Sequence, residues 1–111
     1  MQRHEAHELL AELDKPNGAS QLLVDLTVKM DLGHGVPLVS DRWFLGCWNG
    51  INKGLEDFAL QKGIDISTPD QRQALVVLCT ELYARGRIEA EFGIGADDYK
   101  KMRELHPFFD I

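Results

Sequence analysis

The stretch TPDQRQALVVLCTEL, residues 68–82, combines the strongest helix-start signal in the chain with a long apolar run. Thr68 offers an N-cap hydroxyl, Pro69 suits the first helical position, and Gln71 is placed to complete a capping box. The residues that follow are apolar on most sides of a helix: Leu75, Val77, Leu78, Cys79 and Leu82. A helix that is apolar nearly all round is buried, so we expect the rest of the chain to pack around this one.

Two amphipathic segments precede this central helix. Residues 3–14 place their apolar side chains on one face, and the turn sequence at 15–18 ends the segment. A longer helix is predicted from Ser40 or Asp41, either of which can act as its N-cap, to about Gln61, with Gly63 ending it. The core stripe of this longer helix has helical spacing throughout: Phe44, Trp48, Ile51, Leu55 and Phe58.

The C-terminal third predicts shorter elements. Gly86 either bends or ends the central helix, so residues 87–92 continue it or form a short helix of their own. A last helix over 97–106 begins with two acids, and Pro107 follows it. We expect this helix to bury Tyr99, Met102 and Leu105, and the apolar tail at 108–111 to fold back on the core.

Residues 21–32 fit two patterns. Apolar and polar residues alternate from Val24 to Leu32, as in a strand, but a helical stripe is also present, through Ala19, Leu22, Leu23, Leu26 and Met30. A strand would pair only with residues 36–40, and a lone two-stranded hairpin is marginal in water. We therefore favour a helix, with a small β-hairpin over residues 22–40 as the alternative. The prediction is an all-α, compact single domain over residues 1–111, a bundle of five or six short helices.

Composition narrows the possible partners. The 111 residues carry 18 acidic and 12 basic side chains, for a formal charge of −6, which opposes binding to nucleic acid or to an anionic membrane. The longest apolar run, residues 74–79, is far too short to cross a bilayer, and the first ten residues lack the apolar core of a signal peptide. We expect a cytoplasmic protein with no membrane contact, in which Cys47 and Cys79 are buried free thiols.

The segment WFLGCWNGINKG, residues 43–54, places three glycines inside the predicted 41–61 helix. Gly46, Gly50 and Gly54 form one row, roughly 120° from the core stripe, with Trp43 at its edge. Interior glycines together cost the helix about 2–3 kcal/mol relative to alanine, so a compensating contact is expected. Either another helix of the bundle packs closely on the row, or the row and Trp43 receive a partner protein or a small ligand. A break of the helix at 49–50 or 52–54 is the third explanation, and the uninterrupted core stripe argues against it.

Residues 87–105 resemble a helix-turn-helix in their hydrophobic skeleton, which makes a DNA-binding regulator the alternative function. The basic candidates for nucleic-acid contact are Lys100, Lys101 and Arg103. Gly95-Ala96-Asp97-Asp98 occupies the end of the second helix that would enter the groove, and two acids there oppose a phosphate backbone. A structural corner is therefore favoured over a DNA reader.

Signals of catalysis are weak throughout the sequence. His4 and His7 have metal-ligand spacing on one helix face, but no second ligand cluster accompanies them. The chain has no glycine-rich phosphate loop, and it has no nucleophile motif. We expect a non-enzyme without cofactor or metal that binds another protein as an inhibitor, adaptor or assembly factor, with a phage or mobile element as a suggested source. Self-association into a homo-oligomer is compatible with this expectation.

Overall fold

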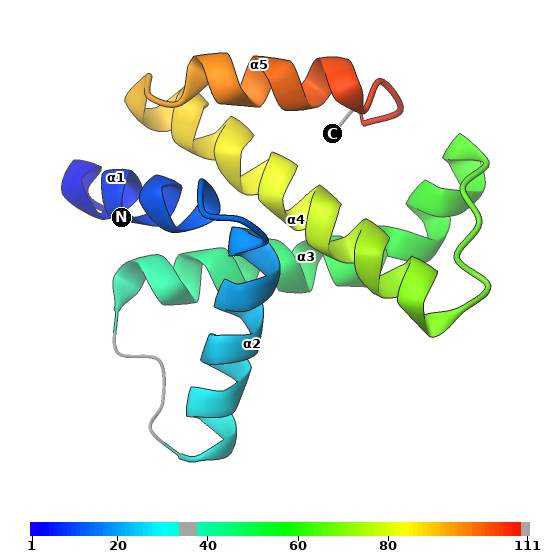
Figure 1. The fold of residues 1–111 in the computed structure, drawn as a ribbon, viewed down its shortest axis with the longest axis horizontal. Helices are drawn as coiled ribbons and strands as arrows, with labels where there is room; N and C mark the ends of the chain where they lie inside the picture. The colour runs from blue at the N-terminus through cyan, green and yellow to red at the C-terminus, as the bar shows by residue number, and fades with distance from the viewer. Residues whose placement is uncertain (34–37, 110–111) are drawn as a thin grey trace.

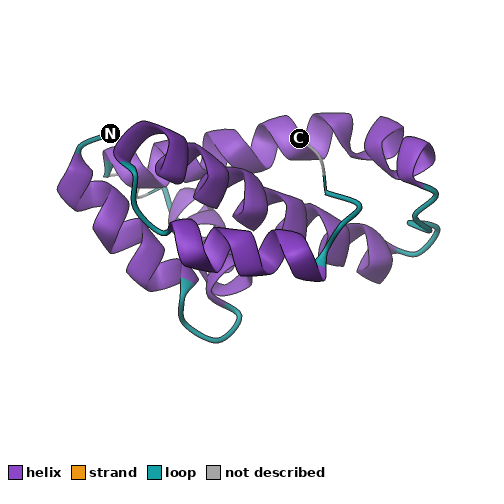
Figure 2. Cartoon of the chain, turned by 90° about the horizontal axis from the view of Figure 1, so that it is seen from above, coloured by secondary structure: helices purple, strands orange, loops and turns teal. Residues whose placement is uncertain are grey.

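The computed structural model describes residues 1–33 and 38–109, and these contain five α-helices and no strand (Figures 1 and 2). The helices are α1 (Arg3–Leu13), α2 (Gly18–Asp31), α3 (Val39–Lys62), α4 (Pro69–Phe92) and α5 (Ala96–Leu105). The predicted all-α bundle of short helices is confirmed.

Helix α4 is the central element, as its apolar circumference predicts. It packs against each of the other four helices. Its predicted capping box is present: the hydroxyl of Thr68 accepts a hydrogen bond from the backbone N–H of Gln71 at 3.2 Å, and the Gln71 side chain accepts one from the backbone N–H of Thr68 at 3.1 Å. The helix continues through Gly86 and ends at Gly93, whose φ of 67° is left-handed. The break considered at Gly86 is therefore absent. Tyr99 of α5 packs against that glycine.

Helix α2 settles the ambiguity of residues 21–32, because the hairpin alternative is wrong for the residues described. Leu23 and Leu26 are buried, whereas Val24 and Val28 are about half exposed. The buried residues recur with the 3.6-residue spacing of a helix and lie on the one side of α2 that packs against other described helices, which explains both observations. The apparent alternation of a strand arises from exposed valines. Residues 34–37, which the hairpin would have used, lie outside the described part of the chain.

The start of α3 and the burial of α5 correct two expectations. Helix α3 begins at Val39 after an extended Leu38, so Ser40 and Asp41 are not its N-cap but lie buried in its first turn. Its predicted end at Gly63 is confirmed by a φ of 67° at that residue. Helix α5 buries no residue fully: Tyr99 and Met102 are partly buried against the second apolar cluster, whereas Leu105 is 75% exposed, so its predicted burial is wrong.

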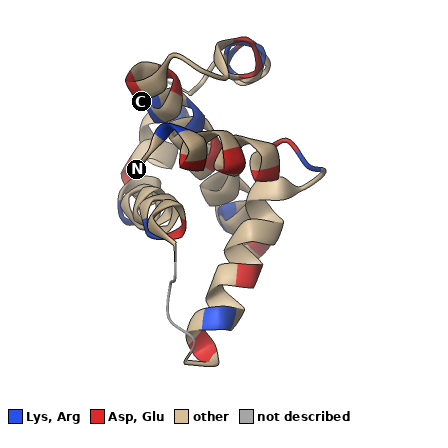
Figure 3. Ribbon diagram, turned by 90° about the vertical axis from the view of Figure 1, so that its left-hand side faces the viewer, with Lys and Arg blue, Asp and Glu red and all other residues tan. Residues whose placement is uncertain are grey.

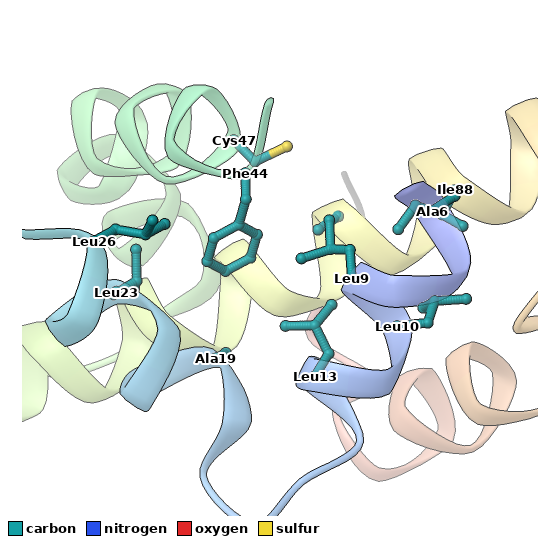
Figure 4. Close-up of a cluster of buried hydrophobic side chains, with 11 residues drawn as sticks. Ala6, Leu9, Leu10, Leu13, Ala19, Leu23, Leu26, Phe44, Cys47 and Ile88 are labelled. Atoms are coloured by element: carbon teal, nitrogen blue, oxygen red, sulfur yellow. The ribbon is translucent and has the colours of Figure 1, made fainter. Parts of the chain in front are cut away.

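The apolar side chains form two clusters that share α3 and α4. The first joins α1 and α2 to the N-terminal half of α3 and the C-terminal half of α4 (Figure 4). The second joins the other halves of α3 and α4 to Phe109, which is 4% exposed and confirms that the tail folds back as far as this residue, whereas residues 110–111 lie outside the described part of the chain. Three partly buried side chains pack against both clusters: Trp48, Val77 and Tyr83. The core thus leaves one long side of α3 facing outward.

Candidate partner-binding face of helix α3

The three glycines of α3 lie on its outward side. Gly46, Gly50 and Gly54 are all exposed, and a Cβ atom placed on any of them would meet no described neighbouring atom within 4 Å. The explanation by a buried helix crossing is therefore wrong for the described chain. The row is an open strip of helix backbone about two turns long. We call Gly46, Gly50 and Gly54 the glycine strip.

The orientation of the strip follows from the core stripe of α3. Phe44 and Leu55 are 0% and 1% exposed and direct one face of the helix into the bundle. Because the glycines are offset by roughly 120° from this stripe, they emerge at the surface beside the line where α3 meets α4. The uninterrupted helix on which the sequence prediction depended is present.

A small apolar hollow adjoins the C-terminal half of the strip. It measures about 250 Å³ and lies between α3 and α4, lined by Gly50, Ile51, Gly54, Leu55, Phe58 and Cys79. The absence of side chains at the two glycines opens its mouth. A hollow of this size and lining suits one or two apolar side chains of a partner.

Trp43 forms the other end of the strip, but its ring is not a free anchor. The side chain is half-buried, and the guanidinium of Arg87 on α4 lies 5.0 Å from the ring centroid. Arg87 also lies 5.9 Å from the ring of Tyr83 and pairs with Glu91 at 3.4 Å. The indole is thus held in place by a cation–π contact.

Cys47 lies next to this arrangement and has the wrong environment for a nucleophile. Burial raises the pKa of the Cys47 thiol, and the nearby positive charge of Arg87 offsets only part of that rise. Reactive cysteines require the opposite, a lowered pKa and access to solvent. Burial also raises the pKa of Cys79, to about 11. Both cysteines are free and buried, as predicted.

The basic residues of the alternative, nucleic-acid site do not share one face. Lys100, Lys101 and Arg103 are exposed on α5, but successive residues turn by roughly 100°, which directs Lys101 away from the other two. Lys100 and Arg103 line a hollow that also contains Glu89 and Glu104, and Arg103 lies 5.5 Å from the ring of Tyr99. The acids nearby reduce any field that would attract phosphate.

The position of the strip was predicted from the sequence, whereas the hollow beside it and the contact of Arg87 with Trp43 were not. Ile51 and Phe58 have helical spacing typical of core residues, so nothing marked them as the lining of a surface hollow. Arg87 lies on a different helix from Trp43, and no local pattern connects the two. The apolar residues of α4 keep their helical spacing beyond Gly86. This spacing is the one signal that could have suggested that the C-terminal part of α4 contacts α3 near Trp43.

Neither a membrane span nor a metal site is present in the described residues, 1–33 and 38–109. These residues contain no helix long and apolar enough to span a membrane, and no group of three or more His, Cys, Asp or Glu side chains placed to hold a metal ion. Comparison of the chain with protein-family models, with curated proteins and with solved structures finds no match. Its function is therefore inferred from its own residues and their geometry.

Proposed function

We propose that this protein acts by binding another protein through the glycine strip and the adjoining apolar hollow of α3. One observation carries the proposal: within the described chain, no neighbouring atom comes within 4 Å of a Cβ placed at Gly46, Gly50 or Gly54. The strip lowers helix stability by about 2–3 kcal/mol relative to alanine, and no packing within the described chain compensates for that loss. A partner that approaches the bare backbone closely would supply the compensation.

The shape of the face favours a helix or an extended segment as the contacting element. Side-chain-free positions one turn apart let a second backbone approach α3 closely, as small residues do at tight helix crossings. An apolar side chain of that element would enter the hollow between Ile51 and Phe58. The charge of −6 favours a partner with a basic surface, because opposite charges speed the encounter.

The test is Gly50→Leu with a matched control, Asn49→Leu. Both residues are exposed on α3, so both variants should remain folded, but only the first fills the strip. Proteins retained from extract of the source cells by immobilised wild type would be identified by mass spectrometry and then purified for direct binding measurements. We expect Gly50→Leu to weaken binding of the purified partner at least tenfold, and Asn49→Leu to leave it within twofold.

Two results would decide against the proposal. One is equal affinity of wild type and a folded Gly50→Leu variant for every partner recovered. The other is unfolding of Gly50→Leu while Asn49→Leu stays folded, which would mean that the strip is packed internally. Sedimentation of the purified protein distinguishes a second copy of this chain from a different partner.

A further inference from the structure

A third hollow lies in the corner formed by α1, α2 and the start of α3. Its volume is about 410 Å³, within the about 300–1,000 Å³ usual for ligand sites. Its apolar floor contains Leu9 and Leu26, which are 4% and 1% exposed and belong to the first core cluster (Figure 4). Leu38, which is 54% exposed, stands at its edge.

Carboxylates surround this floor. Glu8 and Glu12 come from α1, Asp25 from α2 and Asp41 from the first turn of α3, whereas Lys29 is the one cation among the described lining residues. Figure 3 shows acidic positions along α1 and on α2. Glu12 pairs with the exposed Lys15 at 2.9 Å, and Asp25 accepts a hydrogen bond from Gln21 at 2.9 Å. With Glu12 paired to Lys15, the lining retains three further carboxylates against Lys29, so the corner is negative.

The environment of Asp41 distinguishes this corner from an ordinary acidic surface. The residue is 8% exposed and lines the hollow, and among the described residues its carboxylate has neither a hydrogen bond nor an ion pair, so its oxygens face the solvent of the hollow. The N-terminal end of α3 favours a negative charge there, and no described side chain or backbone group donates a hydrogen bond to the carboxylate oxygens. Buried carboxylates are normally paired or hydrogen-bonded, since burying an unpaired charge is costly. A group that fills this hollow displaces water from Asp41, so a group that brings a positive charge and hydrogen-bond donors to this carboxylate is favoured.

We infer that the corner of α1, α2 and α3 binds a lysine or arginine side chain of a partner protein. The aliphatic stem would lie on Leu9 and Leu26, and the cationic head would reach Asp41, because both side chains bury their stems and keep their charge among polar groups. An arginine would donate two parallel hydrogen bonds to the carboxylate. This site lies on a different face of α3 from the glycine strip, so it does not depend on the function proposed there.

The test uses the full chain and four capped peptides in a titration followed by backbone amide chemical shifts. The probes are acetyl-Ala-Leu-Lys-Leu-Ala-amide and its analogues with arginine, norleucine or glutamate at the central position. Norleucine keeps an aliphatic stem without the charge. We expect the lysine and arginine peptides to shift the amides of Leu9, Leu26 and Asp41, and to bind at least tenfold more tightly than the norleucine and glutamate peptides.

Variants identify the residues responsible. Asp41→Asn should weaken the lysine peptide about tenfold or more, since it removes the charge of a hydrogen-bonded partner. Glu8→Gln, an exposed change that leaves folding intact, should weaken it more modestly. Lys29→Ala should strengthen it, because the competing cation is removed. Asp57→Asn, which removes an exposed acid of α3 that does not line this hollow, is the control and should leave affinity within twofold.

Three outcomes would overturn the inference. The first is equal binding of the norleucine and lysine peptides, which would make the hollow merely apolar. The second is unchanged lysine-peptide affinity in both Asp41→Asn and Glu8→Gln. The third is that spermidine or butylammonium binds as tightly as the lysine peptide, which would identify a site for small amines and not for a protein side chain.

Discussion

Replacing all three glycines of the strip with alanine should make the isolated protein more stable. Each exposed glycine in a helix interior costs up to about 1 kcal/mol relative to alanine, and the added methyl groups meet no described atom within 4 Å at Gly46, Gly50 or Gly54. The triple variant should therefore gain about 2–3 kcal/mol, which is a large fraction of the about 5–15 kcal/mol typical of a domain. At about 4–8 °C per kcal/mol, the midpoint of thermal unfolding should rise by about 10 °C or more.

Urea unfolding followed by tryptophan fluorescence and by far-ultraviolet circular dichroism measures this gain. The slope of free energy against urea should not change, because the surface exposed on unfolding is nearly the same. Gly86→Ala is the comparison variant in α4: its Cβ would lie 2.9 Å from the hydroxyl oxygen of Tyr99 and 3.0 Å from Cζ, so the crowding should offset the gain in helix propensity and this variant should gain less than a strip position does. A triple variant less stable than wild type would refute the reasoning, since it would mean that the strip packs against the chain itself. Repeating the measurement at several protein concentrations detects any contribution from self-association.

Three further predictions concern other parts of the chain. Gly18→Ala should lose about 1–3 kcal/mol or more in urea unfolding, because the new Cβ would overlap the carbonyl oxygen of Glu12 and lie 2.8 Å from that of Leu13; unchanged stability would contradict the tight corner between α1 and α2. Thr68→Ala should lose about 1 kcal/mol by removing the N-cap of α4, whereas Thr68→Ser should lose little. Burial raises the pKa of Cys79 from 9.0 to about 11, so the folded state holds its proton more tightly than the unfolded state. The resulting stability is present below pH 9 and lost as the pH rises toward 11; alkaline urea unfolding should decline less steeply for Cys79→Ala, and parallel curves would contradict the shift.

Local signals allowed the helix boundaries to be predicted where the chemistry is contained in a few adjacent residues. The capping box at Thr68 and the left-handed glycine at Gly63 are such cases, and both are confirmed. Asp41 was misassigned as a cap because a short acidic residue before an apolar helix has that role in most sequences. Its burial in the first turn depends on α1 and α2 closing around it, which no adjacent residue reveals.

Longer-range features explain the other errors and omissions. The strand-like alternation of α2 arose from Val24 and Val28, which are exposed because nothing in the described chain covers that side of the helix. The position of the glycine strip was predicted correctly from helical geometry alone, but whether another helix covered it depended on how α3 and α4 cross. The hollow beside the strip and the acidic corner each combine residues from two or three helices, so neither had a sequence signature.

The division of the core into two clusters has a consequence for cooperativity. Each cluster is small, and what joins them is the continuity of α3 and α4 together with Trp48, Val77 and Tyr83, which pack against both. All-or-none melting of the domain thus depends on these three side chains transmitting loss of order from one end to the other. Replacing these three side chains with alanine should uncouple the unfolding of the two clusters. Helices α1 and α2 would then unfold first, while the helical hairpin of α3 and α4 remains folded.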